Sequence, residues 1–383
     1  MNRGPLRHLE EELAELERRG LLRERPPPID RPRAAELLNL CSNDYLGYRS
    51  GGRLATFAKI ASEEHAPGSG ASRLVCGEHA AHAELEATLS RWLGADETLV
   101  FTTGYAANVG AIAALAGEGD LVVSDALNHA SIIDGCRLSR ARHVIVSHNS
   151  PDEVREALKG ARARRRWVVT ESYFSMEGDG PDLAALRSIC DECDAALIVD
   201  EAHALGVLGP QGRGRAHEAG VRPDVLVGTL GKALGAQGAF VAGSRELCRW
   251  LWNRARSFVF STGLSPLLCA IGRGAVEEAQ SDESGRARLR YIGDRFRSRL
   301  VDRGIPVTSR DGPILPILLG SEREALSWSR GLAQRGVWVQ AIRPPTVSPG
   351  TARLRVTMRA DLTDDEVDRA IGALVSVAEG RPR

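Results

Sequence analysis

The sequence predicts an α/β fold with a mainly parallel central sheet flanked by helices, followed by a smaller C-terminal α+β domain. Short apolar runs alternate with helical patterns of ten or more residues, as in a sheet that is buried on both faces. From about residue 265 the pattern changes to a long charged helix followed by short strands. We therefore expect an N-terminal helix and linker (1–37), a large α/β domain (38–264) and a small α+β domain (265–383).

The elements follow from these periodicities, taken in chain order. An amphipathic helix is expected at about 5–20, ahead of the prolines at 26–28. In the large domain we expect helices at 80–93, 105–116, 130–139, 151–159 and 182–193, and strands at 98–101, 121–124, 143–147, 167–171, 196–200, 224–229 and 239–243. In the small domain we expect a helix at 267–300, strands at 314–318, 337–342 and 354–358, and a helix at 363–378.

Charge and cysteine content exclude several classes of protein. Lys+Arg and Asp+Glu are both 50, so there is no basic field to attract nucleic acid or an anionic membrane. No apolar run reaches the roughly 20 residues of a membrane span. Seven scattered cysteines fit a reducing, cytoplasmic compartment better than a disulfide framework. His79 with His82, and Cys190 with Cys193, lack the further ligands of a zinc site, so no metal is expected.

Lys232 is the most informative single residue. The chain has only three lysines, Lys59, Lys159 and Lys232, so nearly every basic position is arginine. Arginine stays protonated, whereas a lysine in an apolar site has a lowered pKa and can form an imine. The stretch before Lys232 is not a phosphate-binding P-loop, because Leu226 stands where that motif needs glycine and Ala233 where it needs Ser or Thr.

Other polar residues follow the predicted strands at their carboxyl ends, where α/β proteins bind ligands. Gly104 and Tyr105 begin a helix, where free backbone N–H groups could bind an anion. The glycine could also serve only a tight strand–helix turn. Asp200 could pair with a protonated ring nitrogen, and His203 could hydrogen-bond a ring oxygen. Alternatively, Asp200 caps the next turn and His203 is a structural histidine of the core. His129 could stack on a ring or cap the next helix. Together with Lys232, this set indicates pyridoxal 5′-phosphate (PLP).

From about residue 38 to the C-terminus, the chain resembles the α-oxoamine synthases, a family of fold-type I PLP-dependent transferases. The motifs that carry the resemblance are Ser42–Gly47, Gly68–Arg73, Thr103–Asn108, Asn128–Ser131, Glu171–Asp179, Val199–His203, Thr229–Lys232, Phe260–Thr262, Ile342–Val347 and Gly350–Arg355. The Arg-Pro-Pro-Thr-Val run at 343–347 resembles the branch that condenses L-alanine with a pimeloyl thioester.

The resemblance implies a set of cofactor-binding residues: Gly104, Tyr105, His129, Ser175, Asp200, His203, Thr229, Lys232 and Thr262. Lys232 would form the Schiff base and later move the α-proton, Asp200 would pair with the pyridinium nitrogen, and His203 would bind the ring oxygen. His129 would stack on the ring. Thr262 would reach the phosphate from a second subunit, which implies a homodimer with its active site at the interface.

The resemblance also implies the substrates. Asn43 and Arg355 would bind the carboxylate of L-alanine, and Arg23 the distal carboxylate of pimeloyl-CoA or pimeloyl-acyl-carrier protein. The product would be 8-amino-7-oxononanoate, a step of biotin synthesis, with release of CO2 and thiol. A related synthase that uses glycine or serine with another acyl-CoA stays open, as do an aminotransferase and a non-catalytic subunit. Ser348 and Gly263 depart from the family pattern and bear on the fit of the acyl chain.

Overall fold

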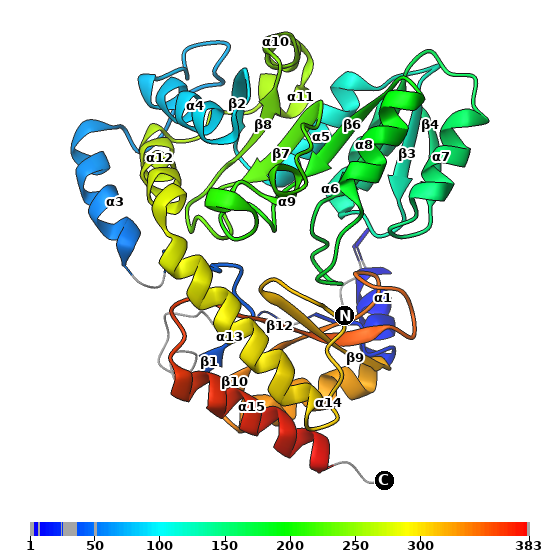
Figure 1. Ribbon diagram of the computed structural model, residues 1–383, viewed down its shortest axis with the longest axis vertical. Coiled ribbons are helices and arrows are strands. Elements are labelled where there is room, and N and C mark those ends of the chain that lie inside the picture. Colours follow the sequence, from blue (N-terminus) through cyan, green and yellow to red (C-terminus); the bar gives the residue numbers. More distant parts are fainter. Residues whose placement is uncertain (1–3, 7, 24, 26–36, 50–51, 381–383) are drawn as a thin grey trace.

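The structure, a computed structural model, describes residues 4–6, 8–23, 25, 37–49 and 52–380. Figure 1 shows a large layered body around a central sheet, with a smaller body below it. The helix pair α12 (Pro266–Ser281) and α13 (Glu283–Val301) runs from the large body into the small one. No helix in the described ranges is long and apolar enough to cross a membrane.

The central sheet has seven strands in the order β2-β8-β7-β6-β5-β3-β4. β8 alone runs opposite to the other six strands of this sheet, so the prediction of a mainly parallel sheet is confirmed. Its strands are β2 (Glu97–Phe101), β3 (Leu121–Asp125), β4 (Arg142–Val146), β5 (Arg166–Glu171), β6 (Ala195–Asp200), β7 (Val225–Thr229) and β8 (Ala239–Gly243).

Helices cover both faces of this sheet because its strands carry apolar side chains on both sides. Val169 packs with the helices of one face and Val168, its neighbour on β5, with those of the other. The first face holds α5 (Gly104–Leu115), α6 (Ala130–Ser139), α10 (Arg245–Arg254) and α11 (Arg256–Val259). The second holds α7 (Pro151–Lys159), α8 (Leu183–Glu192) and α9 (Arg215–Glu218). Near β2, α4 (Ala80–Leu93) packs against α12, which also packs against α3 (Arg53–Glu64).

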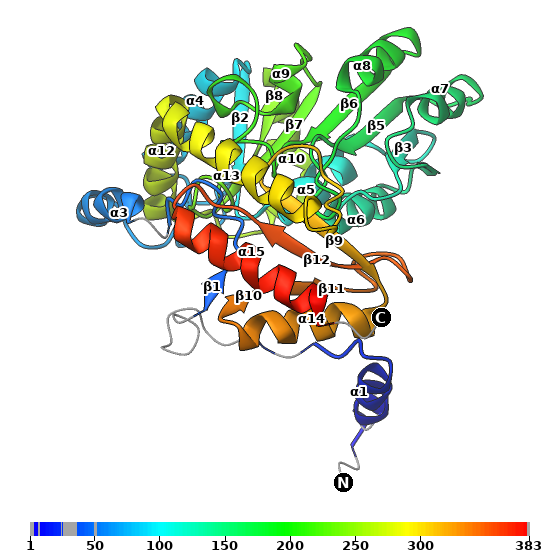
Figure 2. The same ribbon diagram turned by 60° about the horizontal axis from the view of Figure 1, so that its bottom comes forward.

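The small body is built on the three-stranded antiparallel sheet β11-β12-β9. Its strands are β9 (Ile314–Gly320), β11 (Gln340–Ile342) and β12 (Ala352–Thr357). A second pair joins β1 (Leu38–Asn39) to β10 (Val337–Trp338) in parallel. The helix α15 (Asp364–Glu379) packs against both α13 and α14 (Glu322–Gln334), as Figure 2 shows.

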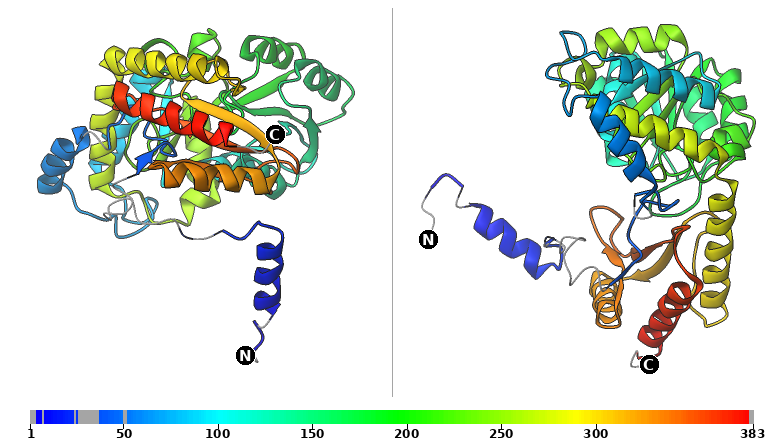
Figure 3. Two further views of the ribbon diagram at one scale, coloured as in Figure 1. Left: turned by 90° about the horizontal axis from the view of Figure 1, so that it is seen from below. Right: turned by 90° about the vertical axis from the view of Figure 1, so that its left-hand side faces the viewer.

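The N-terminal helix α1 (His8–Arg18) stands away from both bodies and buries no residue (Figure 3). The prediction of a helix in this region is confirmed. Its leucines Leu9, Leu13 and Leu16 are 38–51% exposed.

Several predicted elements differ from the structure. The single helix at 267–300 is wrong, because Asp282 ends α12 and caps α13 by accepting the Gly285 amide at 2.9 Å. The strand at 337–342 is two short strands, β10 and β11. α3, α10 and α14 were not predicted. The division at 37/38 and 264/265 stays a prediction, although β1 lies in the sheet pair of the small body.

Candidate active site

The candidate site lies where the carboxyl ends of the parallel strands face β12 of the small body. Arg355 on β12 joins the two sides. Its Nε donates to the carbonyl of Ser175, in the loop after β5, at 2.5 Å. Its Nη1 donates to the amide oxygen of Asn43 at 2.9 Å. Residues far apart in the sequence therefore form one crevice, as expected at this edge of an α/β sheet.

Lys232 follows β7 and is partly buried at this edge. Within the described residues its amine makes no hydrogen bond or ion pair. Burial lowers the pKa of Lys232 from 10.5 to about 8, and the negative charges of Asp200 and Glu171 limit that shift. A lysine with this pKa is partly deprotonated at neutral pH. Because the neutral amine is the nucleophilic form, part of the Lys232 population can act as a nucleophile.

Asp200 ends β6 and is only 7% exposed. The amide nitrogen of Asn108, on α5, donates to its Oδ2 at 2.7 Å, and the Ala202 amide donates to its Oδ1 at 2.8 Å. Asn108 also donates to the Ser131 hydroxyl at 2.9 Å, which fixes the amide. A buried carboxylate with only neutral donors is set up for a cationic partner.

Burial disfavours the protonated form of both predicted histidines. Nδ1 of His203 lies 2.7 Å from the Tyr45 hydroxyl. Burial lowers the pKa of His203 well below its usual value, and the charges of Lys232 and Arg355 lower it further. Burial also lowers the pKa of His129. His129 caps α6, since its Nδ1 accepts the Ser131 amide at 3.2 Å.

Glu171 is a buried acid of the site that was not predicted. It ends β5, and its Oε1 accepts the backbone N–H of His129 at 2.7 Å. Burial raises the pKa of Glu171 to about 8, and the nearby Asp200 carboxylate adds to the shift. Glu171 therefore ties β5 to the segment that positions His129.

A candidate anion site lies where α5 begins, next to the end of β7. Thr103 caps α5 by accepting the Ala106 amide at 3.1 Å. In the described part of the chain, the amides of Gly104 and Tyr105 have no protein acceptor, as the first turn of a helix leaves them. A Cβ built on Gly104 would lie 3.9 Å from Cβ of Thr229, so the two predicted phosphate residues are adjacent. The Tyr105 side chain itself points elsewhere, to Asp134.

Arg355, Asn43 and Tyr45 are joined by hydrogen bonds and form a second candidate anion site. Nη2 of Arg355 donates to the Tyr45 hydroxyl at 3.2 Å, and that hydroxyl lies 3.2 Å from the Asn43 amide oxygen. Arg355 is 6% exposed, and no acid of the described residues pairs with it. A buried guanidinium with only neutral partners is suited to bind a carboxylate.

Three predicted residues stand apart from this cluster or touch it only through the backbone. Ser175 contributes its carbonyl to Arg355, and its hydroxyl makes no hydrogen bond among the described residues. Thr262 is exposed on the loop after α11 and contacts none of the site residues by a hydrogen bond. Arg23 donates to the Thr346 hydroxyl at 3.1 Å, in the loop that follows β11.

Sequence reasoning missed Tyr45, Asn108 and Glu171. Each stands in a motif that carried the family resemblance, so the signal was present. Their roles depend on partners up to 310 positions away, as for Tyr45 and Arg355, and no local pattern shows such a pairing.

The residues present fit PLP on two observations of this structure. The amine of Lys232 has no partner among the described residues, and the amides of Gly104 and Tyr105 are free donors there, beside a glycine that leaves room for an anion. Asp200 adds a carboxylate that pairs with no cation in the described part of the chain and is suited to a pyridinium nitrogen. One group with a carbonyl, a phosphate and a protonated ring nitrogen satisfies all three.

Comparison with known proteins agrees with this geometry. The model of the family "Aminotransferase class I and II" matches residues 35–374. An 8-amino-7-oxononanoate synthase of Anaeromyxobacter dehalogenans (strain 2CP-1 / ATCC BAA-258) is 46% identical over 390 residues, covering 100% of this chain and 98% of that protein.

Two solved structures are similar over most of the chain. A serine palmitoyltransferase variant from S. paucimobilis with a bound PLP–myriocin aldimine is 27% identical with a TM-score of 0.91, covering 98% of this chain and 99% of that one. An 8-amino-7-oxononanoate synthase from Francisella tularensis is 25% identical with a TM-score of 0.78, covering 90% and 98%. The chain belongs to the aminotransferase class I and II family of fold-type I PLP enzymes and, within it, to the 8-amino-7-oxononanoate synthases.

Proposed function

We propose that this protein condenses L-alanine with a pimeloyl thioester to give 8-amino-7-oxononanoate, CO2 and free thiol. The observation that carries the proposal is the position of the Lys232 amine, which has no hydrogen-bond or ion-pair partner among the residues that the structure describes and lies near Asp200 and the Arg355 and Asn43 pair. That is the set of groups that a decarboxylative condensation of an amino acid needs.

Several residues would hold PLP. The amides of Gly104 and Tyr105 and the hydroxyl of Thr229 would bind its phosphate. Asp200 would keep its ring nitrogen protonated, and the neutral His203 would meet its ring oxygen. When bound, PLP supplies an electron sink for negative charge on the α-carbon of the amino acid.

Arg355 and Asn43 orient the amino acid. Two parallel N–H donors of the guanidinium would hold the carboxylate and fix the direction of the Cα–H bond. The Lys232 amine then accepts the α-proton at Nζ, for which its lowered pKa suits it. As the Cα–C bond to the thioester carbonyl forms, the thiolate leaves. When CO2 departs, its bonding electron pair stays on Cα, and Nζ returns the proton there.

The acyl chain meets the side of the site near Arg23. We assign its distal carboxylate to Arg23, whose guanidinium lies at Thr346 in the Arg-Pro-Pro-Thr-Val run. Gly263 also bears on the fit. A Cβ there would lie 3.0 Å from Cγ of Arg73 and 3.2 Å from Oγ of Ser69, so a larger residue is excluded unless both side chains move.

A homodimer in the cytoplasm completes the proposal. Thr262 is exposed, and Phe260 beside it is 71% exposed, which favours a second copy of the chain on this surface. All seven cysteines are free thiols, as expected in a reducing compartment.

A donor screen tests the reaction. CO2 release would be measured with L-alanine, glycine or L-serine against pimeloyl-CoA, pimeloyl-acyl-carrier protein and palmitoyl-CoA. We expect turnover with L-alanine and a pimeloyl thioester. Comparing pimeloyl-CoA with pimeloyl-acyl-carrier protein shows which of the two is the acyl donor. Turnover with L-serine and palmitoyl-CoA instead would identify the alternative synthase. Amino-group exchange with a keto acid without CO2 release would identify an aminotransferase.

A further inference from the structure

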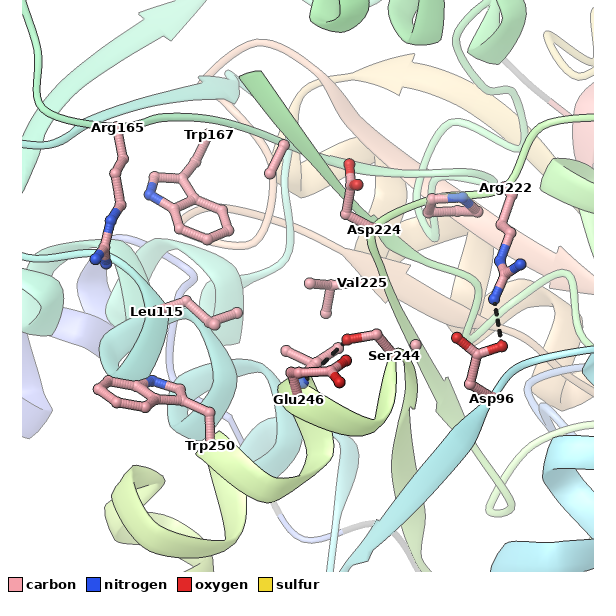
Figure 4. A pocket seen from close by; sticks show the side chains of 14 residues that line it. Asp96, Leu115, Arg165, Trp167, Arg222, Asp224, Val225, Ser244, Glu246 and Trp250 are labelled. Atoms are coloured by element: carbon pink, nitrogen blue, oxygen red, sulfur yellow. Dashed lines mark hydrogen bonds and ion pairs between the residues drawn. The ribbon is translucent and has the colours of Figure 1, made fainter. Parts of the chain in front are cut away.

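A hollow of about 700 Å³ lies where β5, β6 and β7 begin, at the edge of the central sheet away from the candidate active site (Figure 4). None of the residues assigned above to PLP, alanine or the acyl chain lines it. Two charged side chains of its wall already have charged partners, because Arg222 pairs with Asp96 at 2.9 Å and Asp224 pairs with Arg187 at 2.7 Å. The hollow is therefore separate from the candidate site, and these paired charges select no ligand.

A buried network of hydrogen bonds at the candidate site joins Asp200 to His129, two residues proposed to contact PLP. Nδ2 of Asn108 donates to Oδ2 of Asp200 at 2.7 Å and to the Ser131 hydroxyl at 2.9 Å. The same hydroxyl lies 2.7 Å from Nδ1 of His129. Asn108 is 2% exposed and Ser131 is 0% exposed, so the bonds that join them to Asp200 are shielded from bulk solvent.

The network depends on the close approach of α5 and α6. Asn108 lies on α5, and Ser131 is the second residue of α6, directly after the first turn begins at His129. Gly135, one turn further along α6, lets the two helices meet. A Cβ at Gly135 would lie 3.0 Å from Cβ of Ile112 and 3.1 Å from the carbonyl oxygen of Asn108, both on α5. The packing of the two helices therefore holds the two side chains within hydrogen-bond distance.

The donors and acceptors of this network fix where its protons lie. Asp200, as a carboxylate, only accepts, so Asn108 must turn its NH2 group toward it; the flipped amide would place Oδ1 against the carboxylate. The second N–H of that group donates to the Ser131 hydroxyl, whose own proton is then free for Nδ1 of His129. Nδ1 also accepts the Ser131 amide at 3.2 Å, so in the neutral ring the proton is on Nε2.

Asn108 makes these bonds at some cost to stability. Its Oδ1 is buried and has no hydrogen-bond partner in the described part of the chain. Because a buried acceptor without a donor destabilises the folded state, the benefit of an amide at this position lies in the two bonds that its nitrogen donates.

We infer that Asn108 and Ser131 are positioning residues that determine which atoms of the site carry protons. Asn108 keeps Asp200 charged, because each N–H that a carboxylate accepts favours its ionised form, and a charged Asp200 leaves the proton on the ring nitrogen of PLP. Ser131 keeps the proton of His129 on Nε2, which makes no hydrogen bond among the described residues and is available to a ligand. The inference rests on the proposed pairing of Asp200 with PLP.

Nitrogen-15 NMR of the PLP-loaded protein tests the role of Asn108. Labelled PLP reports whether its ring nitrogen is protonated, and we expect a protonated ring nitrogen in the parent protein. Asn108→Leu, which has a similar size and no donor, should move this signal toward that of the neutral ring. It should also weaken PLP binding by about ten-fold, the effect of losing one hydrogen bond to a charged group. Asn108→Ala gives the same comparison if the leucine variant does not fold.

Labelled histidine tests the role of Ser131 in the same sample. His129→Gln identifies the signals of His129 among the nine histidines. We expect a proton on Nε2 only in the parent protein, a larger share of the Nδ1–H form in Ser131→Ala, and the parent signals in Ser131→Thr, which keeps the hydroxyl. Ser139→Ala is the matched control, because this buried serine of α6 bonds to the Cys136 carbonyl at 2.6 Å and lies outside the network.

The outcomes separate this inference from the proposed function. A parent-like ring-nitrogen signal in both Asn108 variants would overturn the role of Asn108. Parent-like His129 signals in Ser131→Ala, or the same change in Ser139→Ala, would overturn the role of Ser131. A neutral ring nitrogen in the parent protein would overturn the pairing of Asp200 with PLP, and the inference with it. The donor screen is a separate result, because none of these spectra depends on turnover.

Discussion

At the scale of single residues, the site depends on charged groups that lack charged partners. Arg355, Asp200 and Lys232 are each buried or partly buried, and among the described residues none forms an ion pair. Holding unpaired charges in a crevice lowers stability, so such groups are expected where a ligand supplies the missing partner.

Arg355→Lys tests the carboxylate site. Lysine keeps the charge but loses the paired, planar donors, so we expect KM for L-alanine to rise by about ten-fold or more, with a smaller change in KM for the thioester. Steady-state kinetics with each substrate varied in turn give the two values. Arg353→Lys, two residues along β12, is the matched control, because Arg353 already pairs with an acidic partner, Glu177, at 2.7 Å. Equal changes in both variants would contradict the assignment.

At the scale of elements, His148 links the end of β3 to the loop after β5 by contacting a carboxylate of each. Nδ1 of His148 lies 3.0 Å from Oδ1 of Asp125, and its Nε2 lies 3.2 Å from Oδ1 of Asp179 in that loop. Its ring also packs edge-on against Phe174 at 4.4 Å. Burial alone would lower the pKa of His148, but the two carboxylates outweigh it and raise the pKa to about 10.

His148→Gln should therefore change how stability depends on pH. Because the folded pKa of about 10 lies above the unfolded value of 6.5, the contribution of His148 is complete below pH 6.5 and is lost as pH rises through 10. The variant should be less stable than the parent protein by about 1–3 kcal/mol at pH 6. Urea unfolding at several pH values should show that this difference shrinks toward pH 10. If the difference in unfolding free energy between the two proteins stays constant with pH, protonated His148 does not stabilise the loop.

The same scale shows what the sequence could and could not predict. The positions of Asp200 and Lys232 at or just after the ends of strands were predictable, because apolar runs mark buried strands and polar residues follow them. The break at Asp282 was missed, although Asp282 caps α13 locally; its hydrogen bonds from Tyr48 and Arg53, each at 3.0 Å and more than 200 residues away, are not visible in the sequence. α14 was missed because its buried side is only Ala325, Trp328 and Leu332 among charged residues.

At the scale of the whole molecule, the crevice joins two bodies, and we propose that a second chain completes it. Thr262→Ala should weaken PLP binding by about ten-fold while leaving unfolding of the chain unchanged, since its exposed hydroxyl makes no bond within the described part of its own subunit. PLP titration with sedimentation would measure both affinity and mass. Ser261→Ala is the neighbouring control. A monomer that retains PLP fully on dilution would rule out the shared site.

The most direct test of the central claim is reductive trapping of PLP on the protein, followed by peptide mass spectrometry across a pH series. Lys59 and Lys159 are exposed and serve as internal controls, because the chain has no other lysine besides Lys232. We predict one PLP per chain on Lys232, with a trapping rate that rises with pH around a midpoint of about 8 as the amine loses its proton. Label spread over Lys59 and Lys159, with Lys232 unmodified or titrating near 10.5, would contradict the account.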